Sequence, residues 1–342
     1  MAALSYMRVF EKLFLRPSVI HIMRLLVALG GNAIKQADEV GSTKEQFANC
    51  EKTAKVIAKI VQKMDKEDRI LITHGNGPQV GNLMVQQEAV KEIIPPQRMD
   101  VVGAMTQGQV GYMIEQSIMN ALAELKVKTD VCVIVTQTIV NRNDPEFFDE
   151  TASKPVGNYM SEDDAKRLKD EHPEYIIKKV KPNDRGWRRV VPSPEPIQQV
   201  EGEVIKKLID MGTVVIASGG GGIPVIKTRR GYRGVEAVID KDLAAERLAE
   251  ITEMDTLLIL TDVERVKLNY GKEGEREIER MSVEEAEKYL EEGQFLRGSM
   301  EPKVKACVRF LKKGGQKAVI SALDKAAEAL DGKSGTEITK NL

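Results

Sequence analysis

The sequence is poor in the residues on which metal, redox and disulfide functions most often depend. Its 342 residues include three cysteines, Cys50, Cys132 and Cys307. They are odd in number, far apart and in no CxxC pair, which argues against a disulfide framework or a zinc centre. Each lies in an apolar pattern. The sequence therefore predicts reduced core thiols in a cytoplasmic protein.

Histidine and unbalanced charge are also scarce. Of His21, His74 and His172, only His74 lies beside a candidate site, and no Ser/His/Asp arrangement is suggested. The 51 basic and 52 acidic residues give a net charge of −1. No overall field then favours nucleic acid or an anionic membrane, so we expect neither as a partner and expect any basic site to be local.

The first 22 residues differ from the rest, with basic side chains among apolar ones and Glu11 as the sole acid. Their apolar run is too broken to span a bilayer. We expect residues 1–22 to be a dispensable extension, with the fold beginning at Met23.

What the chain does contain is an alternation of short apolar runs with longer amphipathic segments. Residues 25–29 are wholly apolar and end in glycines, as in a buried parallel strand. Such alternation predicts an α/β fold with a mostly parallel sheet covered on both faces. Strands are expected at 25–29, 70–73, 131–136, 213–218, 257–260 and 318–321, and helices at 43–64, 79–91, 101–125, 197–211, 282–292 and 302–313.

Residues 141–194 interrupt this alternation. They are rich in proline, contain the single tryptophan, Trp187, and show little sustained periodicity. Apolar pieces such as residues 175–180 persist, so the pattern indicates an inserted subdomain or lid rather than a linker.

Three of the expected strands end in glycine turns: Gly30-Gly31-Asn32, Gly75-Asn76-Gly77 and residues 219–222. One such turn is as typical of packing as of binding. Because ligands of open α/β sheets bind at the carboxyl ends of strands, three turns predict one shared crevice. None matches a dinucleotide fingerprint, since Val80 stands where G-x-G-x-x-G requires glycine.

A further candidate site lies where a β-branched run ends in Asp240-Lys241-Asp242 and a helical pattern begins. Either aspartate could cap the helix. Lys241 is unfavourably placed at the positive helix end, and the flanking carboxylates offset this cost. Alone, the pattern is typical of a capping aspartate beside a solvated lysine. Together with the glycines of 219–222, it predicts a site for a phosphorylated ligand.

These motifs resemble a known family. LGGNAI, THGNGPQVG, SGGGG, the Asp-Lys-Asp helix start, LTDV and GSMEPK occur in the order of the amino acid kinase superfamily, over residues 23–342. HGNGPQVG with DVVGAMTQGQVGY, TASKPVGNY, WRRVVPSPEP and VEAVIDKD resemble its carbamate kinase branch. The acetylglutamate kinase branch is less similar, because it carries a lysine in the first strand motif where this chain has Ala28.

The resemblance implies an open three-layer αβα sandwich with a central, mostly parallel sheet and a small protruding subdomain. Residues 23–212 would form a carbamoyl-phosphate lobe with 141–194 as its lid, and residues 213–342 a nucleotide lobe. The reaction would be reversible phosphoryl transfer, in which ADP and carbamoyl phosphate give ATP and carbamate. The resemblance also implies a homodimer.

The site residues follow from the same resemblance. The catalytic set would be Lys154, Lys241, Asp242 and Lys303. Substrate would contact Gly30, Gly31, Asn32, Gly75, Asn76, Gly77, Gly219 and Gly220. Nucleotide would contact Lys241, Thr261, Asp262, Val263, Tyr270, Met300 and Lys303. Mg²⁺ would be held mainly by the nucleotide phosphates, with no protein metal site.

Two other functions stay open at this stage. One is a sister kinase acting on another small carboxylate or phosphate acceptor, which the acceptor-side motifs disfavour. The other is a catalytically silent nucleotide sensor on the same fold. Presence of all four charged catalytic residues argues against the sensor, because phosphoryl transfer depends mainly on positioning and charge neutralisation.

Overall fold

The computed structural model describes residues 22–341, except 37, 149, 182–183 and 297. The extension expected at residues 1–22 therefore lies, apart from Ile22, outside the described residues. Within the described part of the chain, no helix is both long and apolar enough to cross a membrane.

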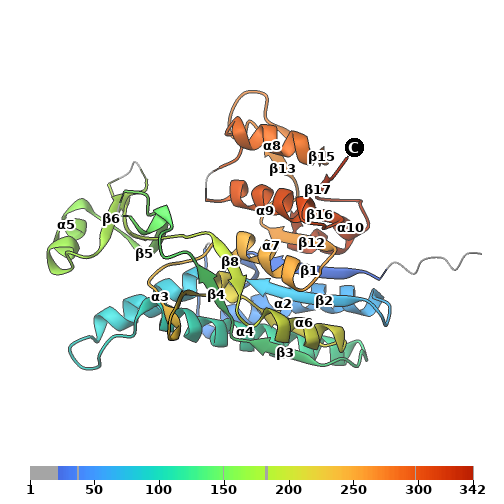
Figure 1. The fold of residues 1–342 in the computed structure, drawn as a ribbon, viewed down its shortest axis with the longest axis horizontal. Coiled ribbons are helices and arrows are strands. Elements are labelled where there is room, and N and C mark those ends of the chain that lie inside the picture. The colour runs from blue at the N-terminus through green and yellow to red at the C-terminus, as the bar shows by residue number, and fades with distance from the viewer. Residues whose placement is uncertain (1–21, 37, 149, 182–183, 297, 342) are drawn as a thin grey trace, which may run out of the picture.

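A central sheet of eight strands organises the molecule (Figure 1). Its order is β15-β17-β16-β12-β1-β2-β9-β3, and neighbouring strands are parallel except β16 and β17. The strands are β1 (Arg24–Leu29), β2 (Arg69–His74), β3 (Val131–Ile134), β9 (Val214–Ala217), β12 (Thr256–Thr261), β15 (Arg280–Ser282), β16 (Lys317–Ala322) and β17 (Thr336–Thr339).

Helices cover both faces of this sheet, because its central strands alternate apolar side chains between two cores. In β1, Leu25, Val27 and Leu29 belong to one hydrophobic cluster, whereas Leu26 and Ala28 belong to the other. The first cluster includes α2 (Thr43–Lys63), α4 (Met99–Glu124) and α10 (Ala326–Leu330), and the second α6 (Gly202–Asp210), α7 (Lys241–Ile251), α8 (Val283–Glu291) and α9 (Met300–Lys312). The predicted three-layer sandwich is thus confirmed.

The helix starts follow local capping chemistry. At α2, the Ser42 hydroxyl accepts from the Glu45 backbone N–H while the Glu45 carboxylate accepts from the Ser42 N–H. Ser282 and Glu285 form the same capping box at α8. Each box satisfies backbone donors that have no partner within the helix, so these ends are fixed by short sequence motifs.

A second sheet lies beside the main one, with strand order β11-β10-β4-β8. Its strands are β4 (Gln137–Val140), β8 (Pro196–Gln199), β10 (Ile223–Thr228) and β11 (Gly231–Gly234). The helix expected at 197–211 was therefore wrong at its start. Residues 196–199 pair with β4 as a strand, and the helix begins at Gly202.

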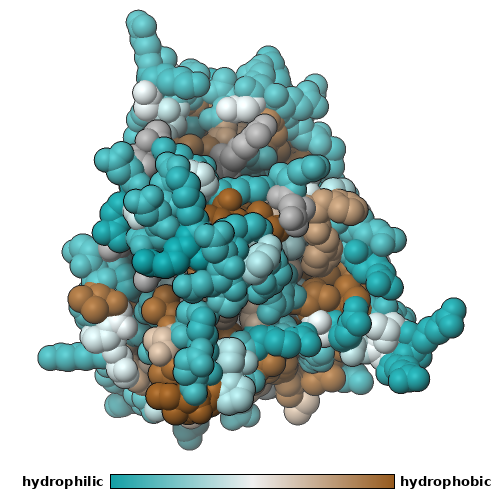
Figure 2. Space-filling model, turned by 90° about the vertical axis from the view of Figure 1, so that its left-hand side faces the viewer, coloured by the Kyte–Doolittle hydropathy of each residue, from teal (hydrophilic) through white to brown (hydrophobic). Residues whose placement is uncertain are grey.

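A protruding unit separates β4 from β8 and lies within residues 141–194. It comprises β5 (Lys154–Met160), α5 (Glu162–Glu171), β6 (Ile176–Lys179) and β7 (Trp187–Val191), with strand order β5-β7-β6. Figure 1 shows it extending away from the central sheet, beyond α3 (Gly77–Ala89). Seen from that side, the molecule is mainly hydrophilic, with hydrophobic groups concentrated toward the lower part (Figure 2).

Smaller elements complete the described chain. The strands β13 (Val266–Leu268) and β14 (Arg276–Ile278) form a hairpin between β12 and β15. Short 3-10 turns are η1 (Gly31–Ala33), η2 (Pro145–Phe147), η3 (Gly219–Gly221) and η4 (Leu323–Lys325).

The topology brings several strand ends to one edge. The five adjacent strands β16, β12, β1, β2 and β9 run parallel, so their carboxyl ends share one side of the sheet. Turn η1 follows β1, and η3 follows β9. Between them, Gly75 and Asn76 follow β2, which places the three predicted glycine turns beside one another.

Candidate active site

A cavity of about 460 Å³ opens at this edge of the sheet. It contains seven residues that the sequence assigned to the site, namely Gly30, Gly31, Asn32, Lys241, Thr261, Asp262 and Lys303, together with Ala33, Gln36, Lys52, Val56, Leu260, Ala322, Leu323 and Asp324. The wall thus combines backbone of the η1 turn with two lysines from α7 and α9.

Helix α7 begins at the wall of this cavity, and its cap is Asp240. The Asp240 carboxylate accepts from the backbone N–H groups of Asp242 at 3.0 Å and Leu243 at 3.4 Å. Sequence alone left the choice between Asp240 and Asp242 open. Because Asp240 takes the capping role, the side chain of Asp242 is free to bind lysines.

Asp242 holds two lysines with its two carboxylate oxygens. Lys241 Nζ donates to Oδ1, and Lys303 Nζ lies 3.1 Å from Oδ2. Asp242 is only 2% exposed. Burial opposes its ionisation, but the two ammonium groups outweigh this and lower its pKa to about 2. The carboxylate is therefore a fixed negative charge at neutral pH.

The two lysines are brought close together by this shared carboxylate. Burial lowers the pKa of Lys241, Asp242 opposes that shift, and the charge of Lys303 adds to it. Lys303 also donates to the Ser299 carbonyl at 3.2 Å. Two positive groups at a cavity wall, balanced by one buried anion, form a site that gains from a further negative ligand.

Lys154 reaches the same region from the protruding unit. Its Nζ lies 3.0 Å from Asp240 Oδ2, across 86 positions of sequence. Asp240 was expected only as a possible cap, so its contact with Lys154 is one that the sequence did not indicate. The three predicted lysines consequently meet at the first turn of α7.

The glycine turns leave room for backbone to approach closely. A Cβ on Gly30 would lie 2.9 Å from the Leu260 carbonyl oxygen, and Gly220 has a φ of +65°, where an added Cβ would overlap the Asn76 side-chain amide. Gly75 lies beside both Gly31 and Lys241. The three turns and α7 therefore form one continuous surface, although residues 75–77 and 219–220 do not line the 460 Å³ cavity.

His74 is part of this scaffold. It is 1% exposed, its ring packs against Gly219, and its Nδ1 lies 3.0 Å from the Gly75 carbonyl oxygen. Burial lowers the pKa of His74 to about 4. The imidazole is neutral at pH 7, and its contacts join the turn after β2 to the turn after β9.

A second cavity, of about 130 Å³, adjoins the first through Thr261 and Asp262, which line both. Three more residues predicted to contact nucleotide line it: Val263, Tyr270 and Met300. The structure thus gathers these five predicted nucleotide residues into one place, between β12 and the start of α9.

Comparisons with known proteins identify the family of this chain. The model of the amino acid kinase family matches residues 23–321. A carbamate kinase of Thermococcus kodakarensis is 50% identical over 319 residues, covering 93% of this chain and 99% of that protein. The chain belongs to the carbamate kinase branch of the amino acid kinase family. A carbamate kinase of Trichomonas vaginalis, at 45% identity over 93% of this chain and 100% of its own length, extends the likeness.

A solved carbamate kinase has the same fold. The structure from Giardia lamblia bound to AMP-PNP has a TM-score of 0.86 at 40% identity, covering 93% of this chain and 99% of that one. The family, the fold class and phosphotransferase activity as a carbamate kinase, all expected from the motifs, are confirmed, and the two alternative functions are disfavoured. The roles of individual residues stay predictions.

Proposed function

We propose that Lys154, Lys241 and Lys303 together neutralise the phosphoryl group as it moves between ADP and carbamate. The observation that carries this proposal is the arrangement at Asp242, whose two oxygens hold two lysines at a cavity wall. Preorganised cations of this kind stabilise charge that spreads over the phosphoryl oxygens in the transition state, without reorganisation during the reaction.

The chemistry needs no general base on the protein. When ATP forms, an ADP oxygen that is already anionic attacks the phosphorus, and the bond between phosphorus and the carbamate oxygen breaks. Carbamate leaves as an anion, and in solution it takes up a proton from water and decays to ammonia and carbon dioxide. A neutral, buried His74 fits this scheme, because no proton has to be removed from the nucleophile.

Each side of the site takes one substrate. We assign the carbamoyl phosphate group to Gly30, Gly31, Asn32 and the neighbouring turns at 75–77 and 219–220. All of these lie in the lobe of residues 23–212 except 219–220, which follow it closely in the sequence. The nucleotide is assigned to the cavity lined by Thr261, Asp262, Val263, Tyr270 and Met300, within residues 213–342. Backbone N–H groups of glycine turns suit phosphate oxygens, whereas the second cavity also offers apolar surface for a base.

Mg²⁺ fits this site as a companion of the nucleotide. Asp262 and Asp324 line the 460 Å³ cavity and offer the oxygen ligands that Mg²⁺ prefers, whereas both oxygens of Asp242 are already bound by lysines. The ion would be held mainly by nucleotide phosphates, where it neutralises their charge. The chain's own contribution is to place the lysines and exclude water.

We further propose that residues 141–194 act as a lid that carries Lys154 to the site. Exclusion of water would prevent wasteful hydrolysis of the phosphoryl donor. Val140 pairs with Pro196, so the two ends of this segment are adjacent, and a short glycine-serine loop can replace it. That replacement should abolish phosphoryl transfer and leave nucleotide binding, measured by calorimetry, within about threefold. Loss of nucleotide affinity as well would contradict the division into two lobes.

We also propose a cytoplasmic homodimer. Edge strand β3 is half-buried along its whole length, and α4 exposes Val101, Met105, Tyr112 and Met119 on its outer side. A sheet edge beside an apolar helix surface suits a second copy of the chain. The thiols of Cys50 and Cys307 are free and buried, and burial raises the pKa of Cys50 to about 12, in keeping with a reducing compartment.

One coupled assay tests the function. Purified chain is mixed with ADP, carbamoyl phosphate and Mg²⁺, and ATP formation is followed, with acetylglutamate plus ATP as the control pair. We expect turnover with the first pair and background with the second. Turnover only with the control pair would indicate a sister kinase. Nucleotide binding without turnover of either pair would indicate a silent sensor.

A further inference from the structure

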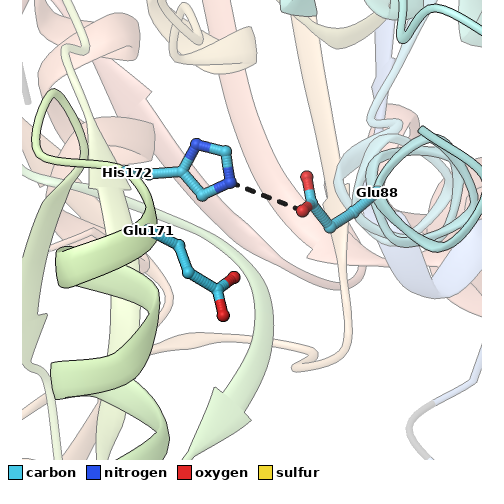
Figure 3. Close-up of side chains that lie close together, drawn as sticks. All are labelled: Glu88, Glu171 and His172. Carbon is cyan, nitrogen blue, oxygen red and sulfur yellow. Dashed lines mark hydrogen bonds and ion pairs between the residues drawn. The ribbon is translucent and has the colours of Figure 1, made fainter. Parts of the chain in front are cut away.

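A cluster of potential metal ligands lies where the protruding unit contacts the main body, apart from the lysine site. Glu88 comes from α3, whereas Glu171 and His172 come from the end of α5. One oxygen of each glutamate and one ring nitrogen of the histidine all lie within 4.8 Å of one another. Figure 3 shows the three side chains extending into the space between the two helices.

His172 is held in an orientation suited to metal binding. Its Nε2 lies 3.4 Å from Glu88 Oε1, while its Nδ1 lies 3.2 Å from Glu174 Oε1. The ring also stacks on Tyr175, with 4.4 Å between centroids and 9° between planes. Histidines that bind metals usually donate their second ring N–H to a carboxylate, which fixes the tautomer and makes the ligating nitrogen more basic. Glu174 supplies that carboxylate.

We propose that Glu88, Glu171 and His172 bind one Zn²⁺ or similar divalent transition-metal ion, which joins α3 to α5. One imidazole and two carboxylates are a ligand set that zinc takes in proteins, with water in the remaining position. The ligands come from two separate parts of the fold, so the bound ion would fix the protruding unit against the body.

Lys91 is the competitor for this site. Its Nζ lies 2.5 Å from Glu88 Oε1 and so occupies the oxygen that faces His172. A bound ion would take the place of this ammonium group. Lys91→Met should therefore tighten Zn²⁺ binding, by roughly two- to fivefold if the exposed ion pair has ordinary strength. Glu174→Gln should weaken it about 10- to 100-fold, because the histidine loses its orienting carboxylate.

The test uses the full-length, untagged chain, stripped of metal and kept free of nucleotide. The Cys132→Ser variant serves as the parent, because Cys132 is the most exposed of the three thiols and a thiol can bind Zn²⁺. Zn²⁺ binding is measured by calorimetry, and Co²⁺ binding by visible absorption. We expect one ion per chain, lost in both His172→Ala and Glu88→Gln, with Asp163→Asn, an exposed acid in the first turn of α5, unchanged.

Glu88→Gln changes only the body side of the site, so it decides the result even if His172→Ala disturbs the protruding unit. Unchanged Zn²⁺ affinity and Co²⁺ absorption in Glu88→Gln and His172→Ala would overturn the proposal, as would weaker binding in Lys91→Met. Because no nucleotide or carbamoyl phosphate is present, failure here is separate from failure of the proposed kinase mechanism.

Discussion

Asp242 and Glu246 lie one turn apart on α7, and both are almost fully buried, at 2% and 0% exposed. Lys241 and Lys303 bind the Asp242 carboxylate directly. In contrast, neither oxygen of Glu246 has a hydrogen-bond partner among the described residues, and its nearest cations lie 3.5 Å and 3.6 Å away, on Arg247 and Lys313. Burial then raises the pKa of Glu246 to about 7.

The difference shows that burial alone does not decide whether an acid on this helix is charged. Asp242 lies in the first turn, where the N-terminal N–H groups favour an anion and two ammonium groups lie within bonding distance. Glu246 lies beyond that turn. The nearby guanidinium of Arg309 binds Glu195 instead, at 2.7 Å and 3.1 Å. Asp242 therefore keeps its negative charge beside the two lysines at the start of α7. Glu246, one turn further along the helix, can lose its charge by taking up a proton.

The sharpest test of this comparison is to neutralise each acid in turn. Asp242→Asn leaves Lys241 and Lys303 close together without their anion, so we expect kcat to fall at least about 10³-fold and the free energy of unfolding by about 3 kcal/mol. Glu246→Gln should keep kcat within twofold. Steady-state kinetics and urea unfolding measure both. Near wild-type turnover in Asp242→Asn would mean that the first turn of α7 is an ordinary helix cap.

The three lysines should have the next largest effect. Lys154→Ala, Lys241→Ala and Lys303→Ala should each lower kcat about 10²- to 10³-fold, or roughly 2.7 to 4 kcal/mol, with a smaller change in KM. Arginine should restore little, because its planar fork does not occupy the position of a compact ammonium. Lys312→Ala, an exposed lysine paired with Glu287, is the matched control. Equal losses in that control would indicate a general effect of charge.

Much of the fold could be predicted because apolar runs bounded by glycines are typical of parallel strands. The helix expected at 43–64 differs from α2 by one residue, at its C-terminal end. Strand β8 was missed because its four residues alternate weakly and their partner, β4, lies about 60 positions away. Residues 131–136 were expected to form a buried strand. Instead β3 is a half-buried edge strand, because an apolar sequence does not distinguish a central strand from an edge.

The site shows the same limit. The convergence of glycine turns and of Lys241 could be predicted, since the order of strand ends follows from parallel βαβ units. The contact of Lys154 with Asp240 could not, because it depends on how the protruding unit folds back. The burial of Glu246 could not be predicted either, because its place in the sequence is typical of an exposed acid on a helix. That part of α7 is buried by tertiary packing against elements far away in the sequence, among them α9 and β8, where the Gln199 amide donates to the Ala244 carbonyl.

A smaller effect is expected from the pH dependence of Glu246. Its folded pKa of about 7 exceeds its usual value near 4.5, so the folded state binds more protons between these values. Its contribution to stability is therefore fully present below about pH 4.5 and is lost as pH rises through 7. Wild type loses this contribution between pH 5 and pH 8, whereas the glutamine variant has none to lose. The unfolding free energy of Glu246→Gln, relative to that of wild type, should therefore rise by about 1 to 3 kcal/mol from pH 5 to pH 8. Urea unfolding at both pH values measures the gain. If the stability difference between Glu246→Gln and wild type were the same at pH 5 and pH 8, Glu246 would be ionised at both pH values.

The smallest effect concerns Glu195, the acid that binds Arg309 and Lys305. Burial opposes its ionisation, but these two cations lower its pKa to about 2. Its stabilising contribution is therefore present above pH 4.5 and lost as pH falls toward 2. Because its side chain is 46% exposed, solvent screens the pair, and Glu195→Gln should cost only about 0.2 to 1 kcal/mol at pH 7. In 1 M KCl most of that cost should disappear, whereas the pH-dependent gain of Glu246→Gln should persist, because it arises from burial. If Glu195→Gln instead lowered the unfolding free energy by more than about 2 kcal/mol, and salt did not change this loss, solvent would not screen the pair. Glu195 would then be essential to the structure, as Asp242 is expected to be.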